Sequence, residues 1–145
     1  MTTPHVDQLS SDLAIHAARL VRLIRRNLEQ PAGIRVLSLL DEHGALGVTA
    51  LAAADQCSQP TMTGAVARLR DLGWVDTRPN PADARGSLVD LTEAGRRELA
   101  RIREINARLV AERLAAHPDR TVEELAAAVA VLRAVTTDPS EGASQ

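Results

Sequence analysis

The sequence has almost no aromatic residues and no lysine. Trp74 is the single aromatic residue among 145, and arginine carries all of the formal positive charge of the side chains. The core must therefore be built from Leu, Val, Ile and Ala, which suit close helix packing. Arginine presents a planar fork of donors to phosphates and guanine edges, so its exclusive use is compatible with DNA binding, although genome composition is the simpler explanation.

The chain also lacks a large charge of either sign. Its formal net charge is −2, which argues against non-specific coating of nucleic acid. The charge is unevenly spread, because residues 58–97 hold six arginines and five acids, whereas residues 121–145 hold one arginine and four acids. The length and the apolar content of 45% suit one globular domain with a proper core.

Disulfides, signal peptides and membrane spans are not indicated. Cys57 is the single cysteine, so no disulfide can form within the chain, which fits a reducing cytoplasm. Residues 1–12 are polar, and the longest apolar run, residues 125–132, is far too short to cross a bilayer. We therefore expect a cytoplasmic protein with no membrane partner.

Long amphipathic helices are predicted towards both ends of the chain. Apolar residues recur at steps of three and four over residues 6–28, until Pro31 ends the helix. Two further helices are predicted, one capped by Thr92 and reaching about Ala116, the other capped by Thr121. Their apolar stripes exceed what one small domain can cover, so we expect an intertwined homodimer; a monomeric bundle is the alternative.

Shorter elements are predicted between these helices. Residues 32–42 form a second helix that Gly44 ends as a C-cap. Residues 46–48 suit a single short strand, and Thr49 is expected to cap a third helix that runs to about Ala54.

The most informative stretch begins at Ser58, which caps a fourth helix with Pro60 in its first turn. One face of this helix is apolar. The opposite face is small and nearly uncharged, and consists of Pro60, Thr63, Gly64, Ala67 and Asp71. Such a face is not apolar enough for an ordinary buried helix, but it permits close approach to base edges and thymine methyl groups.

A β-hairpin is predicted after this helix. Residues 74–77 and 87–91 are strand-like, and Trp74 is expected to pack at the base of the hairpin. Residues 78–86, with the sequence RPNPADARG, look too long for a tight two-residue turn, so an extended wing is expected. A helix followed by a hairpin is the layout of a winged helix-turn-helix. The predicted fold is thus mainly α, with six helices and a small β-hairpin wing.

Four motifs together carry a family resemblance: residues 58–63 (SQPTMT), the Leu-Gly-Trp-Val run at 72–75, the wing residues 79–86 (PNPADARG) and Leu91-Thr92. With these motifs, the chain resembles the MarR family of bacterial transcription regulators. It implies a homodimer that binds an inverted-repeat DNA operator, usually as a repressor released by a small-molecule effector or by oxidation.

The resemblance also implies how the chain is divided. Residues 1–30 and 92–137 would form a helical dimerisation region, and residues 31–91 a DNA-binding lobe. Residues 138–145 are expected to be a flexible tail. An effector pocket would lie between the first, second and fifth helices, and the scarcity of aromatics predicts a small, aliphatic-lined one.

Six residues are the predicted DNA contacts. The free N–H groups and dipole of a helix N-terminus favour a phosphate, and Gln59 and Thr63 suit base edges. By resemblance, the wing residue Arg85 lies in the minor groove and Asp83 pairs with an arginine to stabilise the wing. The predicted DNA-binding residues are Ser58, Gln59, Thr61, Thr63, Arg68 and Arg85.

Three positions depart from the family pattern. Gly64 and Thr77 stand where the family often has basic residues, and Ala84 replaces a frequently charged wing residue. Together with the net charge, Gly64 and Thr77 favour a second hypothesis, a winged-helix protein-interaction module that has lost specific DNA binding. Gln59, Thr63 and Arg85 argue against it.

Other functional classes have little support in the sequence. Cys57 directly precedes the fourth helix and is either a redox sensor or a small packed residue. The histidines show no metal-ligand spacing with one another or with Cys57. There is no nucleophile–base pair and no glycine-rich phosphate loop, so we expect no enzymatic activity, no cofactor and no metal.

Overall fold

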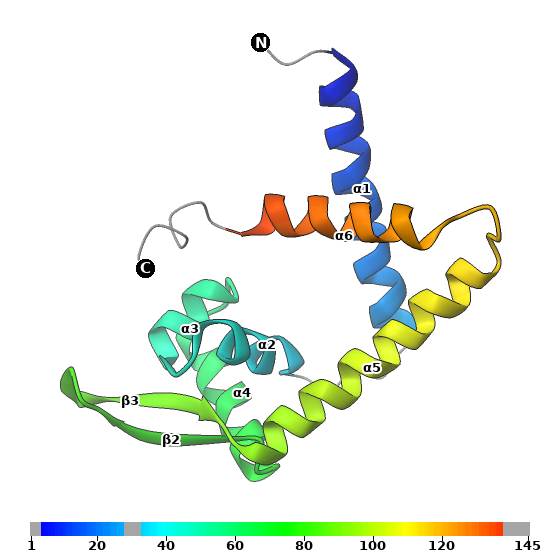
Figure 1. The fold of residues 1–145 in the computed structure, drawn as a ribbon. Coiled ribbons are helices and arrows are strands. Elements are labelled where there is room, and N and C mark those ends of the chain that lie inside the picture. Colours follow the sequence, from blue (N-terminus) through cyan, green and yellow to red (C-terminus); the bar gives the residue numbers. More distant parts are fainter. Residues whose placement is uncertain (1–3, 28–32, 138–145) are drawn as a thin grey trace. The chain divides into compact units, whose positions relative to one another are not determined.

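The computed structural model describes residues 4–27 and 33–137, which form six helices and a three-stranded antiparallel sheet (Figure 1). The elements are α1 (Pro4–Asn27), α2 (Ile34–His43), β1 (Leu46–Gly47), α3 (Val48–Ala54), α4 (Gln59–Asp71), β2 (Val75–Asn80), β3 (Asp83–Leu91), α5 (Glu93–Ala115) and α6 (Val122–Thr136). This architecture confirms the predicted fold. Contacts divide the chain into two compact units, residues 1–106 and 107–145.

One hydrophobic core joins α2, α3, α4, the sheet and the start of α5. Leu37, Leu51, Leu69 and Val89 are fully buried in it. Burying one such side chain contributes about 1.5–3 kcal/mol. Trp74 is half-buried and packs against this core at the base of the hairpin, as predicted. The same core therefore positions α4 and the hairpin.

Two predicted helix ends have different outcomes. Gly44 ends α2 as predicted, with φ at 77° and its N–H donating to the Leu40 carbonyl at 2.9 Å. The prediction that Thr49 caps α3 is wrong, because α3 begins at Val48 with Gly47 at the N-cap. Gly47 is still paired with β3, so the chain passes from the sheet into the helix with no residue between them.

Some predicted boundaries lie outside the described residues. These are the end of the first helix at Leu28 and Pro31, the start of the second at Ala32, and the flexible tail at residues 138–145.

The wing is a longer hairpin than predicted. β3 lies between β1 and β2, and β2 pairs with β3 from Val75 opposite Leu91 to Asn80 opposite Asp83. Only two residues, 81 and 82, connect the strands, so the expectation that this segment is too long for a two-residue turn is wrong. The pairing is irregular near the tip, where its register shifts between Pro79 and Asn80. Figure 1 shows the resulting ribbon, which extends beside α2, α3 and α4.

Two features explain why the prolines did not open this segment into a loop. β2 is an edge strand, where a proline without an N–H removes no bond on its outer side. Side chains also complete the turn, since the Asn80 carbonyl accepts the Ala82 N–H at 2.9 Å and the Asp83 carboxylate accepts the Arg85 N–H at 3.0 Å. Such bonds let Asn and Asp stabilise tight turns.

The start of α5 is fastened to the base of the hairpin. The Thr92 hydroxyl donates to the Gly73 carbonyl at 2.5 Å, and the Thr92 N–H donates to the Trp74 carbonyl at 3.1 Å. The same hydroxyl accepts the Gly95 N–H at 3.1 Å, which confirms Thr92 as the cap. A Cβ at Gly95 would lie 2.0 Å from the Trp74 carbonyl oxygen, so only glycine fits there.

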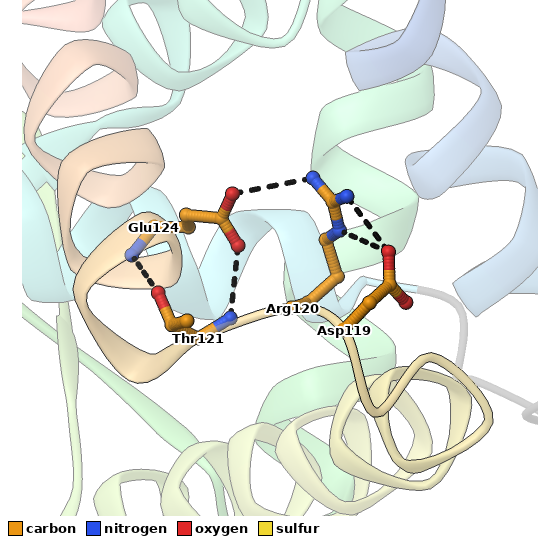
Figure 2. A network of polar contacts seen from close by, with 4 residues as sticks. All are labelled: Asp119, Arg120, Thr121 and Glu124. Atoms are coloured by element: carbon orange, nitrogen blue, oxygen red, sulfur yellow. Dashed lines mark hydrogen bonds and ion pairs between the residues drawn. The ribbon is translucent and has the colours of Figure 1, made fainter.

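The start of α6 carries the predicted cap in the form of a capping box. The Thr121 hydroxyl accepts the Glu124 N–H at 3.1 Å, and the Glu124 carboxylate accepts the Thr121 N–H at 2.9 Å. Arg120 bridges Glu124 and Asp119, at 3.2 and 2.8 Å (Figure 2). The bond from Arg120 lowers the pKa of Asp119.

Large apolar side chains on α1 and α6 remain exposed in the single chain. Leu9 on α1 is 54% exposed and Val129 on α6 is 46% exposed. No described residue of α6 is buried. Within the described ranges, no helix has both the length and the apolar character that crossing a membrane requires.

Gly95→Ala is expected to lower the free energy of unfolding by about 2–3 kcal/mol, because its Cβ overlaps backbone of the hairpin. Gly64→Ala is the control, since a Cβ there meets only the Arg68 guanidinium, at 3.8 Å. It should leave stability equal or slightly higher, as alanine favours helix. Urea unfolding at one fixed protein concentration measures both, and equal effects would contradict the close approach at Gly95.

Candidate nucleic-acid interface

The start of α4 is a capped N-terminus on the surface. The Ser58 side chain accepts the Thr61 N–H at 3.3 Å, and the two hydroxyls lie 2.8 Å apart. This confirms Ser58 as the cap. Pro60 has no N–H, and the Met62 N–H donates to the Ser58 carbonyl at 3.0 Å. A phosphate here would therefore meet the hydroxyls and the helix dipole more than free backbone amides.

The two faces of α4 differ as predicted. Met62, Val66 and Leu69 are buried, whereas Thr63 and Ala67 are exposed on the other side. The exposed side is thus small and uncharged along the first turns, where a helix in the major groove contacts base edges.

Gln59 is exposed, yet its side-chain amide is not free to rotate. The Nε2 atom donates to the Thr49 hydroxyl at 2.7 Å, so α3 and α4 are joined at the protein surface. Thr49, first predicted as a cap, contributes this acceptor instead. No sequence pattern indicates this pairing, because the two residues lie ten positions apart on different helices.

Two arginines of α4 lie near the two positions at which this chain lacks the basic residue that the family often has. The Arg68 guanidinium lies across Gly64, with its Nη1 atom 3.8 Å from where a Cβ of residue 64 would stand. Arg70 donates to the Thr77 hydroxyl at 3.4 Å. Positive charge is therefore present close to both departures. Arg70 was not among the predicted contacts.

The wing carries Arg85 with an exposed side chain, next to the two-residue connection. Asp83 accepts the backbone N–H of Arg85 at 3.0 Å. Over the described residues Asp83 forms no ion pair with an arginine, so its observed bond supports the backbone that presents Arg85. Ala84 between them is exposed as well.

Cys57 lies in the turn between α3 and α4. It is half-buried and packs against the hydrophobic core, and its N–H donates to the Ala52 carbonyl at 3.0 Å. This environment is that of a small packed residue. No group of three metal-ligating side chains gathers within the described part of the chain.

A cavity of about 340 Å³ lies within the first unit, lined by α1, α2, α5 and the end of α3. The resemblance implies an effector pocket between the first, second and fifth helices. Aliphatic residues such as Val21, Ile24 and Ile102 line this cavity, but so do Arg25 and Glu42. The wall is therefore more charged than the sequence suggested.

Two ion pairs involve residues of this wall. The Nε atom of Arg35 lies 2.7 Å from the Asp55 carboxylate, and Arg103 lies 2.8 Å from Asp41. Asp55 is the C-cap of α3 and lies three residues before Ser58, the N-cap of α4. The Arg35 pair thus connects the cavity wall to the segment before α4. It joins residues that lie 20 positions apart, so helical periodicity does not predict it.

Comparison with known proteins gives one consistent result. The model of the MarR family matches residues 31–87. An HTH-type transcriptional regulator of Mycobacterium tuberculosis is 38% identical over 112 residues, which cover 74% of this chain and 78% of that protein. The HTH-type transcriptional repressor IacR of Pseudomonas putida is 33% identical over 75 residues, 52% of this chain and 45% of the repressor.

A solved structure agrees with these sequence matches. A MarR family protein from Bacillus stearothermophilus superimposes with a TM-score of 0.68 at 26% identity, over 93% of this chain and 95% of that one.

Proposed function

The chain belongs to the MarR family of DNA-binding transcriptional regulators, and on that premise we propose that it is a homodimeric repressor. It acts in the cytoplasm on an inverted-repeat operator and is released by a small-molecule effector. The similarity to a named repressor of Pseudomonas putida supports repression over activation.

The surface of α4 is the main support for the proposed mode of DNA binding. Its outer face is small and uncharged near a capped N-terminus, which suits insertion into a major groove. Ser58, Gln59, Thr61 and Thr63 face the groove and its phosphates in this proposal, and Arg68 reaches the backbone.

The wing supplies the second contact. Arg85 enters the minor groove, where a narrow A·T-rich groove attracts arginine. Asp83 stabilises the wing through the backbone of Arg85. In a two-fold dimer, the two α4 helices would meet half-sites roughly 34 Å apart, about one turn of DNA.

The exposed apolar side chains of α1 and α6 support the homodimer. Val122, Leu125 and Val129 line a shallow apolar groove on α6, and Leu9 of α1 is exposed as well. Monomeric proteins seldom expose such surface on adjacent turns of a helix. We therefore assign residues 1–30 and 92–137 to dimerisation and residues 31–91 to DNA binding.

The cavity of the first unit supports the proposal of a small-molecule effector. It is of a size that suits a small molecule, and Arg25, Arg35 and Arg103 lie in its wall beside aliphatic residues. The effector is thus a small molecule with an apolar body and an acidic group. Asp55 lies in the same wall, so an effector in the cavity would contact the segment that precedes α4.

Arg85→Ala is expected to weaken binding to the operator roughly five- to 150-fold, because a groove contact contributes roughly 1–3 kcal/mol. Fluorescence anisotropy measures this on the DNA upstream of the chain's own gene, at two salt concentrations and with random DNA as competitor. Arg97→Ala removes the same charge from an exposed ion pair on α5 and should have little effect. If wild-type protein prefers no sequence, the protein-interaction module becomes the better account.

Val129→Glu is expected to convert a dimer into a monomer, because it places a charge in the apolar groove of α6. Light scattering after size exclusion should give twice the 15.5 kDa chain mass for the wild type. Val131→Glu is the matched control, since Val131 is 49% exposed on the same helix but does not line the groove. A monomeric wild type, or equal loss in both variants, would contradict the proposed interface.

Small carboxylic acids are expected to raise the melting temperature and to release operator DNA, since a ligand stabilises the state it binds. Arg25→Ala should weaken both effects together without changing binding to DNA in the absence of acid. Arg25 is preferred over Arg35 and Arg103 because those two hold ion pairs within the domain. Thermal shift and anisotropy with a panel of aliphatic and aromatic acids test this. Release that Arg25→Ala leaves unchanged would place the effector elsewhere.

A further inference from the structure

The bond between Gln59 and Thr49 joins two helices at the surface proposed to contact DNA. Gln59 is the first residue of α4, and Thr49 lies in the first turn of α3. The Nε2 atom of Gln59 and the Thr49 hydroxyl oxygen are 2.7 Å apart, and both residues are exposed. A bond in contact with water contributes little to stability on its own, so its effect on the position of the amide is the more informative property.

Gln59 is also chemically distinct from its neighbours on the outer face of α4. Thr63 carries one hydroxyl, and Gly64 and Ala67 carry no polar side-chain atom. Over the first two turns, Gln59 alone presents a planar amide, with a carbonyl acceptor and N–H donors side by side. An amide of this kind matches the N6 donor and N7 acceptor of adenine in the major groove.

The bond to Thr49 leaves that pair of groups available. A glutamine amide has two N–H donors and one carbonyl oxygen. One N–H is directed to Thr49, so the second N–H and the carbonyl oxygen remain for a base. The bond favours one orientation of a long side chain that would otherwise sample many rotamers, which reduces the ordering required when DNA binds.

We propose that Thr49 is a positioning residue that orients the Gln59 amide to recognise one adenine in each half-site. The inference rests on the proposed DNA-binding function, and it adds which base is recognised and which residue prepares the contact. Thr49 itself contacts no base in this arrangement. Its place at the N-terminal turn of the first helix of the helix-turn-helix suits a position beside the DNA backbone.

Selection of binding sites from a random DNA library tests the proposal, with the full-length wild type and four variants. The wild type should enrich adenine at one symmetry-related position in both half-sites. Gln59→Ala should reduce that preference about tenfold, and Thr49→Val should reduce it at the same position only. Thr136→Val is the control, because its hydroxyl bonds to Leu132 within α6, and it should select the wild-type site.

Gln59→Glu is expected to create a new base preference rather than to remove one. A carboxylate accepts from the N4 amino group of cytosine, so the preference at that position should change from adenine to cytosine. The salt dependence of binding should stay unchanged in Thr49→Val, since the substitution removes no charge. Thermal unfolding of Thr49→Val should match that of the wild type.

Three results would overturn the inference. Thr49→Val could retain the full adenine preference, it could weaken all positions of the site equally, or Gln59→Glu could leave the selected base unchanged. None of these three results contradicts the proposed function as a DNA-binding regulator. Failure of the wild type to enrich any site would instead remove the proposed DNA-binding function, and this inference with it.

Discussion

The contact between Gly95 and the Trp74 carbonyl is the constraint on which the arrangement of the first unit depends. α5 can start against the hairpin only because residue 95 has no Cβ, and Thr92 then bonds to the backbone on both sides of the junction. Val75 and Val89 enter the core from β2, which begins at this junction, and from β3, which ends there. A change in the direction of α5 at this junction would therefore act directly on the backbone of the hairpin.

The proposed DNA-binding surface combines a small, uncharged face of α4 with a few exposed arginines. Arg68 and Arg70 lie close to Gly64 and Thr77, where related sequences often carry a basic residue, and Arg85 is presented by the backbone bond to Asp83. With few phosphate contacts, a larger share of affinity must come from fitted base contacts. Shape and neutral hydrogen bonds are then the main source of specificity, which is consistent with a net charge of −2.

Sensing and dimerisation are proposed to use overlapping elements. α1 contributes Val21 and Ile24 to the cavity wall and leaves Leu9 exposed. The Arg35–Asp55 pair extends from the same cavity to the end of α3. A ligand that binds one arrangement of these helices better than another would favour that arrangement. It would thereby change the distance between the two α4 helices of the proposed dimer without contacting DNA.

Local features were readable from the sequence, because they depend on neighbours within about four residues. The caps at Ser58, Thr92 and Thr121, the glycine end of α2 and the two faces of α4 follow from side-chain chemistry and helical periodicity alone. Only the tertiary structure decided the length of the wing, because the position of β2 at a sheet edge lets Pro79 remain in a strand. It likewise decided the Thr49–Gln59 and Arg35–Asp55 pairs and the need for glycine at 95, since each depends on how separate elements pack together.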